Sequence, residues 1–237
     1  TILAVGTKPS RPSGVEFDEC KIVDSDGLLK LAEIPRSMTF VGGGIIGVEY
    51  ATIFRTIGVR VTLIDGRQRP LDFIDDEIED NLYFYMRDEG ITLRFGETVC
   101  AVRHTEDGRV QVFMESGKQL ESDGLMFAAG REGASKDLNL EAIGLETDKR
   151  DRIQVDEFYR TSVEDIYAVG DIIGFPSLAS TSMEQGRIAA AHAMANEATA
   201  MAKRLPYGIY TIPEIAMVGP TEEELTKQEV PYETGIA

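Results

Sequence analysis

The apolar positions between residues 38 and 65 form two continuous runs with an amphipathic segment between them. Residues 38–41 and 59–65 are apolar runs of the length expected for buried strands. Residues 44–57 repeat apolar side chains at helical spacing, at Ile46, Tyr50, Ile53 and Ile57. The pattern predicts a strand, a helix and a second strand, with a glycine-rich turn where the first strand meets the helix.

A second helix and a set of alternating strands are expected next. The helix is predicted to begin at Asp75 or Asp76, where acids suit the helix dipole, and to end at Gly90. Its apolar stripe is predicted at Ile78, Leu82, Tyr85 and Met86. Residues 98–105, 109–115 and 118–121 alternate with period two between short turns, and residues 124–129 form one more apolar run. This order predicts an α/β dinucleotide-binding domain with a parallel sheet and a β-meander.

The two ends of the chain carry weaker patterns. Residues 2–5 and 165–171 read as short buried strands, residues 182–197 as a helix, and residues 207–218 as one alternating strand. Thr221 with Glu224 three residues later is a capping box that predicts a further helix. The chain opens on a strand pattern without an initiator methionine, so we expect a piece of a longer protein.

Composition narrows the class of protein. The 237 residues include 41 acidic and 24 basic side chains, a formal net charge of −17, which opposes nucleic acid and anionic membrane surfaces as partners. No apolar run approaches the roughly 18 residues of a membrane span. Cys20 and Cys100 are far apart and read as reduced thiols of a cytoplasmic protein, and His104 and His192 lack neighbouring ligands, so no metal site is expected.

The stretch Val41-Gly-Gly-Gly-Ile-Ile-Gly47 contains the G-x-G-x-x-G pattern of dinucleotide-binding turns. Gly42 permits the tight turn, Gly44 lets the backbone approach a pyrophosphate, and Gly47 lets the helix pack on the strand. The helix N-terminus adds free N–H groups and partial positive charge. The alternative is a glycine-rich turn with a purely structural role.

The end of the second strand carries the residues that distinguish NAD from NADP. Asp65 lies where an acid accepts hydrogen bonds from the adenosine ribose, which favours NAD. Gly66-Arg67-Gln68-Arg69 follows, and its two guanidinium groups suit a 2′-phosphate, although they also fit a solvated loop. The preference stays open, and a site that accepts both nucleotides is the reading we favour.

Two further acids are candidates for cofactor contacts. Glu49 lies in the first turns of the helix, where it would point towards a bound nicotinamide, and is otherwise a solvent-facing acid at a helix N-terminus. Asp171 ends the motif Tyr167-Ala-Val-Gly-Asp171, where it suits a sugar-type hydroxyl, and is otherwise a helix N-cap.

Three motifs in this order resemble the FAD-dependent pyridine nucleotide-disulfide oxidoreductases, the family of glutathione reductase and dihydrolipoamide dehydrogenase. They are Val41-Gly-Gly-Gly-Ile-Ile-Gly-Val-Glu49, Phe127-Ala-Ala-Gly-Arg131 and Tyr167-Ala-Val-Gly-Asp171. The resemblance implies a three-layer ββα Rossmann-like fold that binds FAD and NAD(P). It also implies that Asp171 binds the FAD ribitol, Ile45 gates the nicotinamide pocket, and Glu49 lies beside the carboxamide.

The resemblance also implies how the chain divides. Residues 1–35 would end an FAD domain and its linker, residues 36–135 would form the NAD(P) domain, residues 136–205 would return to the FAD domain, and residues 206–237 would begin a dimerisation domain. The family's N-terminal FAD turn, its cysteine-bearing helix and most of its dimerisation domain would lie outside the chain. We therefore expect the intact protein to be a homodimer, and this chain alone to be inactive.

Finer matches favour members that pass hydride from NADPH through FAD to NAD⁺. They are Asp72-Phe-Ile-Asp-Asp-Glu77, Ile172-Ile-Gly-Phe-Pro-Ser-Leu-Ala-Ser180, Glu184-Gln-Gly-Arg-Ile-Ala-Ala190 and Gly208-Ile-Tyr-Thr-Ile-Pro-Glu-Ile215. Arg131-Glu-Gly-Ala134 departs from the family, which has proline and asparagine after the arginine. The alternatives are a disulfide reductase of the dihydrolipoamide dehydrogenase kind and a non-catalytic NAD(H)-binding module.

The expected cofactors are FAD, NAD and NADP, and Glu49 is the expected catalytic residue through nicotinamide positioning. The expected cofactor-binding residues are Gly42, Gly43, Gly44, Ile45, Ile46, Gly47, Glu49, Asp65, Gly66, Arg67, Arg69, Gly130, Arg131, Gly170, Asp171 and Ala179.

Overall fold

The computed structural model describes residues 1–197, 200–202 and 204–235. The chain forms two compact units, one of residues 1–10 and 131–205 and one of residues 11–130 and 206–237. These boundaries differ from the four segments expected from the sequence, whose assignment to domains stays a prediction. Residues 198, 199 and 203 of the expected third segment, and 236 and 237 of the fourth, lie outside the description. Within the described residues, no helix is long and apolar enough to cross a membrane.

The second unit is built on a five-stranded parallel sheet with the order β3-β10-β4-β5-β6. Its strands are β3 (Ile22–Asp24), β4 (Ser37–Val41), β5 (Arg60–Asp65), β6 (Thr92–Phe95) and β10 (Gly124–Phe127). The helices are α1 (Ser25–Leu28), α2 (Ile45–Thr56) and α3 (Asp76–Asp88). The strand at residues 92–95 was not predicted, because its short half-buried pattern does not stand out in the sequence.

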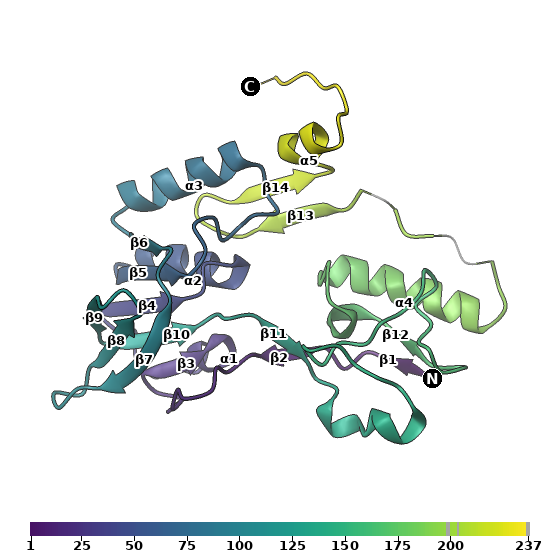
Figure 1. Cartoon of the computed structure of the whole chain (residues 1–237), viewed down its shortest axis with the longest axis horizontal. Helices are drawn as coiled ribbons and strands as arrows, with labels where there is room; N and C mark the ends of the chain where they lie inside the picture. Colours follow the sequence, from purple (N-terminus) through teal and green to yellow (C-terminus); the bar gives the residue numbers. More distant parts are fainter. Residues whose placement is uncertain (198–199, 203, 236–237) are drawn as a thin grey trace. The chain divides into compact units, whose positions relative to one another are not determined.

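Apolar side chains on the two faces of this sheet enter different cores. On β10, Met126 joins the cluster formed with α2 and α3, whereas Leu125 and Phe127 join the cluster formed with the meander. The meander strands are β7 (Val99–His104), β8 (Val110–Met114) and β9 (Gln119–Ser122). Helices, parallel sheet and meander therefore form three layers (Figure 1), which confirms the predicted Rossmann-like fold class.

The buried face of α2 differs from the predicted stripe. Val48 and Ala51 are buried together with Gly47, while Ile53 and Ile57 are exposed. The small side chains of Gly47 and Ala51 allow the helix axis to lie close to the sheet. The prediction was partly right: Ile46 and Tyr50 pack against the core, whereas Ile53 and Ile57 do not, because apolar spacing alone does not show which face of the helix the sheet covers.

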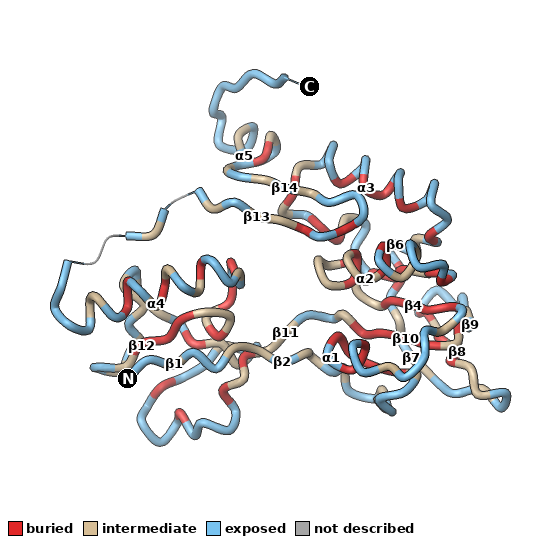
Figure 2. Tube along the Cα trace, turned by 180° about the vertical axis from the view of Figure 1, so that it is seen from behind, coloured by how far each residue is buried: buried red, intermediate tan, exposed pale blue. Residues whose placement is uncertain are grey.

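The stripe on α3 was only partly right. Leu82 and Met86 are buried as predicted, but Ile78 and Tyr85 are exposed and Tyr83 is buried instead. Figure 2 shows the buried positions recurring between exposed ones along this helix. A hydrogen bond from the Tyr83 hydroxyl to the buried Glu79 accounts for the change of face.

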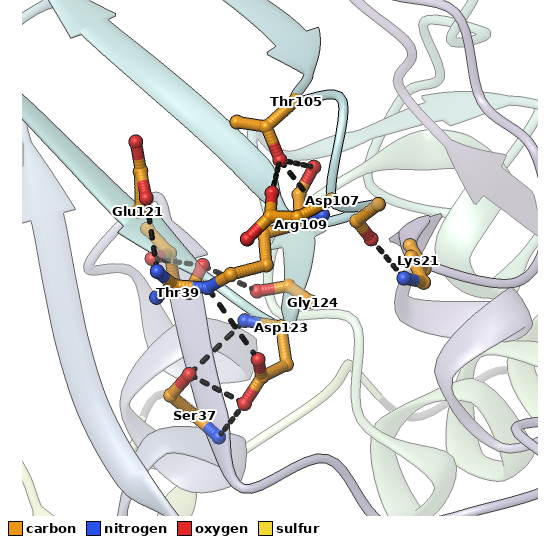
Figure 3. Close-up of polar contacts among 11 residues, drawn as sticks. Lys21, Ser37, Thr39, Thr105, Asp107, Arg109, Glu121, Asp123 and Gly124 are labelled. Atoms are coloured by element: carbon orange, nitrogen blue, oxygen red, sulfur yellow. Dashed lines mark hydrogen bonds and ion pairs between the residues drawn. The ribbon is translucent and has the colours of Figure 1, made fainter.

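Polar contacts join the meander to the start of the central strand (Figure 3). The Asp123 carboxylate accepts hydrogen bonds from the Ser37 N–H at 3.0 Å and the Ser37 hydroxyl at 2.8 Å. Arg109 bridges Glu121 and Asp123, with nitrogen–oxygen distances of 2.9 and 3.6 Å. Through Asp123, these hydrogen bonds and ion pairs hold the meander against the first residue of β4.

The second unit ends in a hairpin and a short helix. Residues 207–218 were predicted as one strand, but they form β13 (Pro206–Ile209) and β14 (Ile215–Val218), which pair antiparallel. Pro213 lies in the connecting loop and has no N–H to donate to a neighbouring strand. The alternation of apolar and polar residues before and after it therefore belongs to two separate strands. The predicted capping box of Thr221 and Glu224 is confirmed at α5 (Glu222–Lys227).

The first unit has short strands, 3₁₀ turns and one long helix. β1 (Ile2–Leu3) pairs parallel with β12 (Tyr167–Ala168), and β2 (Thr7–Pro9) pairs antiparallel with β11 (Arg131–Gly133). The 3₁₀ turns are η1 (Lys136–Leu138), η2 (Leu140–Ile143) and η3 (Gly170–Ile173). The helix α4 (Ala179–Ala193) begins and ends a few residues before its predicted bounds, and the predicted strand at residues 165–171 is shorter than expected.

Candidate functional site

The glycine-rich turn follows β4 at the carboxyl edge of the parallel sheet. The chain runs from β4 to β5 and β6 on one side, whereas β10 pairs with β4 on the other side. Ligands of open α/β sheets bind outside the carboxyl ends of strands where the order reverses in this way. The turn is anchored by the Gly42 N–H, which donates to the Ile64 carbonyl at 2.8 Å.

The three motif glycines have different surroundings. Gly42 has a φ of 108°, and a Cβ there would lie 2.7 Å from the Ala128 carbonyl carbon. A Cβ on Gly47 would lie 2.9 Å from the Gly42 carbonyl carbon and closer still to its oxygen. Around a Cβ on Gly44, no atom lies within 4 Å. Gly42 and Gly47 are therefore required by the fold, and Gly44 borders open space.

The N-terminus of α2 faces this space without a side chain to cap it. Gly44 is the N-cap residue in an extended conformation, and no acid lies in the first turn. The first backbone bond of the helix runs from the Val48 N–H to the Gly44 carbonyl at 3.0 Å. Within the described chain, the N–H groups of residues 45–47 have no acceptor, so they are free for an anion.

Asp65 at the tip of β5 is held by the turn and by Arg67. Its side chain is 8% exposed and accepts the Gly43 N–H at 2.7 Å and the Arg67 N–H at 2.8 Å. The Arg67 guanidinium adds bonds at 3.0 and 3.1 Å. Burial opposes ionisation, but the hydrogen bonds from Arg67 and Gly43 outweigh it and lower the pKa of Asp65.

The lowered pKa of Asp65 predicts an acid-sensitive contribution to stability. A folded pKa below the unfolded value of about 3.9 stabilises the fold above that pH, and the contribution is lost as pH falls through the folded pKa. We expect Asp65→Asn to lower the free energy of unfolding by about 1 kcal/mol at pH 6, because Arg67 is half exposed and the pair is screened. Urea titrations should show this difference shrinking below about pH 4. Glu106→Gln, at an exposed position, is the control, and a difference independent of pH would contradict the assignment.

The two arginines of the loop have different partners. Arg67 is 51% exposed, and its one ion pair among the described residues is with Asp65. Arg69 lies 2.8 Å from Glu79 and 3.0 Å from both Asp76 and Asp80. Arg69 is thus held by the acids of α3, and Arg67 is the guanidinium beside Asp65. Gly66 lies between Asp65 and Arg67, with a Cβ position 3.3 Å from the Thr98 hydroxyl.

Glu49 lies half-buried on α2 and contacts the β13–β14 loop. Its Oε1 accepts the Tyr210 N–H at 2.8 Å. Burial raises the pKa of Glu49, and the hydrogen bond from Tyr210 only partly offsets it. Sequence reasoning missed Tyr210, because residues 207–218 were read as one strand. Ile45 and Ile46 are partly buried against the core beneath the same turn.

The expected flavin-side residues lie mostly in the first unit. Asp171 lies within η3, whose N-cap residue is Val169, and its side chain caps no helix of the described residues, so the N-cap alternative is not what the structure shows. Gly170 has a φ of 78° and donates its N–H to Gln185 Oε1 at 2.7 Å. Within the described part of the unit, no side chain is hydrogen-bonded to the Asp171 carboxylate. Ala179 is the first residue of α4, whose first turn contains no acid.

The Phe127-Ala-Ala-Gly-Arg131 motif crosses from one unit to the other. Gly130 has a φ of 101°, with open space around its Cβ position. Arg131 donates from Nε to the Thr7 hydroxyl at 2.8 Å and from Nη2 to the Thr7 carbonyl at 2.9 Å. Among the described residues, no group of histidine, cysteine and acidic side chains could hold a metal ion.

The fold and the glycine turn are those of the dinucleotide-binding class of Rossmann-like domains. Residues 1–193 match the family described as pyridine nucleotide-disulphide oxidoreductase, and the chain belongs to this family.

Two curated relatives share the name soluble pyridine nucleotide transhydrogenase. The protein from Mycobacterium bovis is 50% identical over 236 residues, covering 100% of this chain and 50% of the relative. The protein from Colwellia psychrerythraea is 46% identical over 237 residues, covering 100% and 51%. The chain thus spans about half the length of the curated relatives that it matches.

Two solved structures share the fold. LpdA from Mycobacterium tuberculosis has a TM-score of 0.90 at 28% identity, covering 97% of this chain and 50% of that protein. The HOCl-induced flavoprotein disulfide reductase RclA from Escherichia coli has a TM-score of 0.88 at 30% identity, covering 95% and 52%.

Proposed function

We propose that this chain carries the nicotinamide-nucleotide site, and part of the FAD site, of a flavoprotein that transfers hydride from NADPH through FAD to NAD⁺. The observation that carries the proposal is the pairing of Asp65 with Arg67 beside the open Gly44 turn. One acid for ribose hydroxyls and one partly exposed guanidinium for a 2′-phosphate suit both nucleotides. The name shared by relatives that are 46–50% identical supports the same activity.

The residues present fit both cofactor classes. The uncapped α2 N-terminus behind Gly44 suits a pyrophosphate, because its N–H groups have no acceptor among the described residues. The uncommitted Asp171 carboxylate suits a ribitol hydroxyl, and the start of α4 at Ala179 offers N–H groups without a neighbouring acid in its first turn. FAD, when bound, supplies the hydride chemistry, so no side-chain nucleophile is needed.

The chain's own residues bind and orient the nicotinamide nucleotide. The turn of residues 42–47 binds the pyrophosphate. Asp65 accepts hydrogen bonds from the ribose hydroxyls of NAD⁺, which replace part of its hydrogen bonding with Arg67. With NADPH, Arg67 turns to the 2′-phosphate, and Gly66 gives the loop room for this change. Glu49 accepts a hydrogen bond from the carboxamide, and Ile45 gates the pocket. NADP⁺ leaves before NAD⁺ enters the same site.

The different partners of the two arginines give a direct test of nucleotide recognition. We expect Arg67→Ala to raise the KM for NADPH about 10- to 100-fold, because it removes one or two hydrogen bonds to a charged group. The KM for NADH should stay within about threefold of the wild-type value. Arg69→Lys, which keeps a cation beside the buried Glu79, is the matched control, with an expected change below about threefold for either nucleotide. Steady-state kinetics of the intact, FAD-loaded protein measure both. Equal losses for NADPH and NADH in Arg67→Ala would contradict the assignment.

A disulfide reductase is the second candidate, because the similar RclA structure carries that description. We would assay the intact protein for transfer from NADPH to thio-NAD⁺ and, in parallel, for oxidation of dihydrolipoamide. Rapid transfer between nucleotides without dihydrolipoamide oxidation supports the proposal, and the reverse result overturns it. A non-catalytic nucleotide sensor would lack the yellow flavin absorbance. We further propose that the intact protein is a homodimer, which sedimentation can test.

A further inference from the structure

The loop between β13 and β14 makes two hydrogen bonds to one face of α2. The Tyr210 N–H donates to Glu49 Oε1 at 2.8 Å, and the Ile212 N–H donates to Thr52 Oγ1 at 3.2 Å. Residues 49 and 52 are three apart in a helix and therefore project from the same side. Two N–H groups spaced two residues apart in the loop thus meet two oxygen acceptors on α2.

The Thr52 hydroxyl links the loop to the backbone that carries Glu49. Thr52 is 3% exposed, and its Oγ1 lies 3.0 Å from the Val48 carbonyl oxygen and 2.9 Å from the Glu49 carbonyl oxygen. Its single proton is donated to these carbonyls, which leaves a lone pair to accept the Ile212 N–H. Valine has a similar shape but can make neither contact.

The loop is itself fixed, so it can act as a rigid donor. Thr211 is buried, and its hydroxyl donates to the Pro213 carbonyl at 2.6 Å. Ile209 before the loop is buried in the core shared with the sheet, and the Tyr207 ring packs on Phe73 with 5.8 Å between ring centroids. The hairpin in Figure 1 is therefore anchored on the same layer as α2.

We propose that Thr52 is a positioning residue, which together with the N–H groups of Tyr210 and Ile212 holds Glu49 in the orientation that accepts the nicotinamide carboxamide. One oxygen of Glu49 is fixed by Tyr210, and the other has no partner within the described residues. A carboxylate fixed before binding loses less side-chain entropy when the ligand arrives. The inference rests on the proposed function, because it takes the α2 turn as the nicotinamide-nucleotide site.

The test is the affinity of the intact, oxidised FAD-loaded protein for NAD⁺, measured by calorimetry. We expect Thr52→Val to weaken NAD⁺ binding three- to tenfold, and Thr52→Ser, which keeps the hydroxyl, to change it less than twofold. The analogue 3-acetylpyridine adenine dinucleotide has no carboxamide N–H, so its affinity should change less than twofold in Thr52→Val. A purely structural role of Thr52 would weaken both ligands equally.

A double-mutant cycle tests whether the effect of Thr52 on NAD⁺ affinity acts through Glu49. In a Glu49→Ala background, Thr52→Val should have no further effect on NAD⁺ affinity, because the group that it positions is gone. The same weakening in both backgrounds, or equal losses in Thr52→Ser and Thr52→Val, overturns the inference. Thr52→Ala replaces Thr52→Val if the latter does not fold, with the same expected pattern.

The two proposals fail in different ways. If the wild-type protein binds NAD⁺ but does not transfer hydride from NADPH, the proposed function is overturned. The positioning role of Thr52 is then still decided by the NAD⁺ affinities of its variants. Wild-type protein that transfers hydride while Thr52→Val binds NAD⁺ normally overturns the positioning role alone. Wild-type protein that does not bind NAD⁺ overturns both.

Discussion

Replacing Gly44 with alanine is expected to abolish nucleotide binding in a protein that still folds. Its Cβ would meet no protein atom within 4 Å, so the substitution causes no clash and costs about 1 kcal/mol or less as a change of N-cap. The same methyl group would occupy the space where a pyrophosphate must approach the N–H groups of α2. Losing two hydrogen bonds to a charged group, at about 1.5–3 kcal/mol each, weakens binding at least 100-fold.

Gly47→Ala is the matched variant with the opposite expectation. A Cβ there would overlap the Gly42 carbonyl group, so the turn must shift and the free energy of unfolding should fall by roughly 2–4 kcal/mol. Urea unfolding and titration with NADH separate the two variants. Normal NADH affinity in a stable Gly44→Ala protein would place the pyrophosphate elsewhere and remove the basis of the proposed site.

The second large effect is expected on stability, at the buried acid of α3. Glu79 is 0% exposed, and its Oε1 accepts the Leu71 N–H at 2.9 Å and the Tyr83 hydroxyl at 2.6 Å. Its other oxygen lies 2.8 Å from Arg69 Nε. Burial and the neighbouring Glu79 raise the pKa of Tyr83, so its hydroxyl stays a donor.

We expect Glu79→Ala to lower the free energy of unfolding by about 3–5 kcal/mol, because it leaves the Leu71 N–H and the Tyr83 hydroxyl without their acceptor in a buried place and removes an ion-pair partner of Arg69. The loss should spread to the loop of residues 66–71, which carries Arg67, and weaken both NADPH and NADH. Asp80→Ala removes an exposed partner of Arg69 and serves as the control, with a change below about 1 kcal/mol. Urea titrations measure the free energy of unfolding of both variants. Equally small decreases in the two would show that the buried Glu79 does not stabilise the fold more than the exposed Asp80 does.

The sequence predicted those parts of the fold that depend on neighbours along the chain. The α/β class and the capping box at Thr221 follow from spacing over a few residues, and the three-layer arrangement was implied by the family resemblance. The structure confirms all three. Which side of α2 and α3 is buried depended instead on the sheet beneath them. Ile53 and Tyr85 are large and apolar yet exposed, because small residues and the Glu79–Tyr83 pair fit the contact better.

The candidate site divides in the same way. Gly42, Gly44 and Gly47 could be recognised from the sequence because their spacing within one turn matches the G-x-G-x-x-G pattern, although their contacts with a nucleotide stay a prediction. The sequence grouped Arg67 with Arg69, and only the structure separated them, since the acids that hold Arg69 lie on α3.

The sequence alone determined the glycine turn, the strand before it and the acid at the end of the next strand, because local backbone geometry and hydrophobic period specify them. Only the tertiary structure decided how Glu49 is held. Its partner, the Tyr210 N–H, lies 161 residues further along the chain. Such a contact depends on how the β13–β14 hairpin packs on α2, and no periodicity in the sequence encodes that packing.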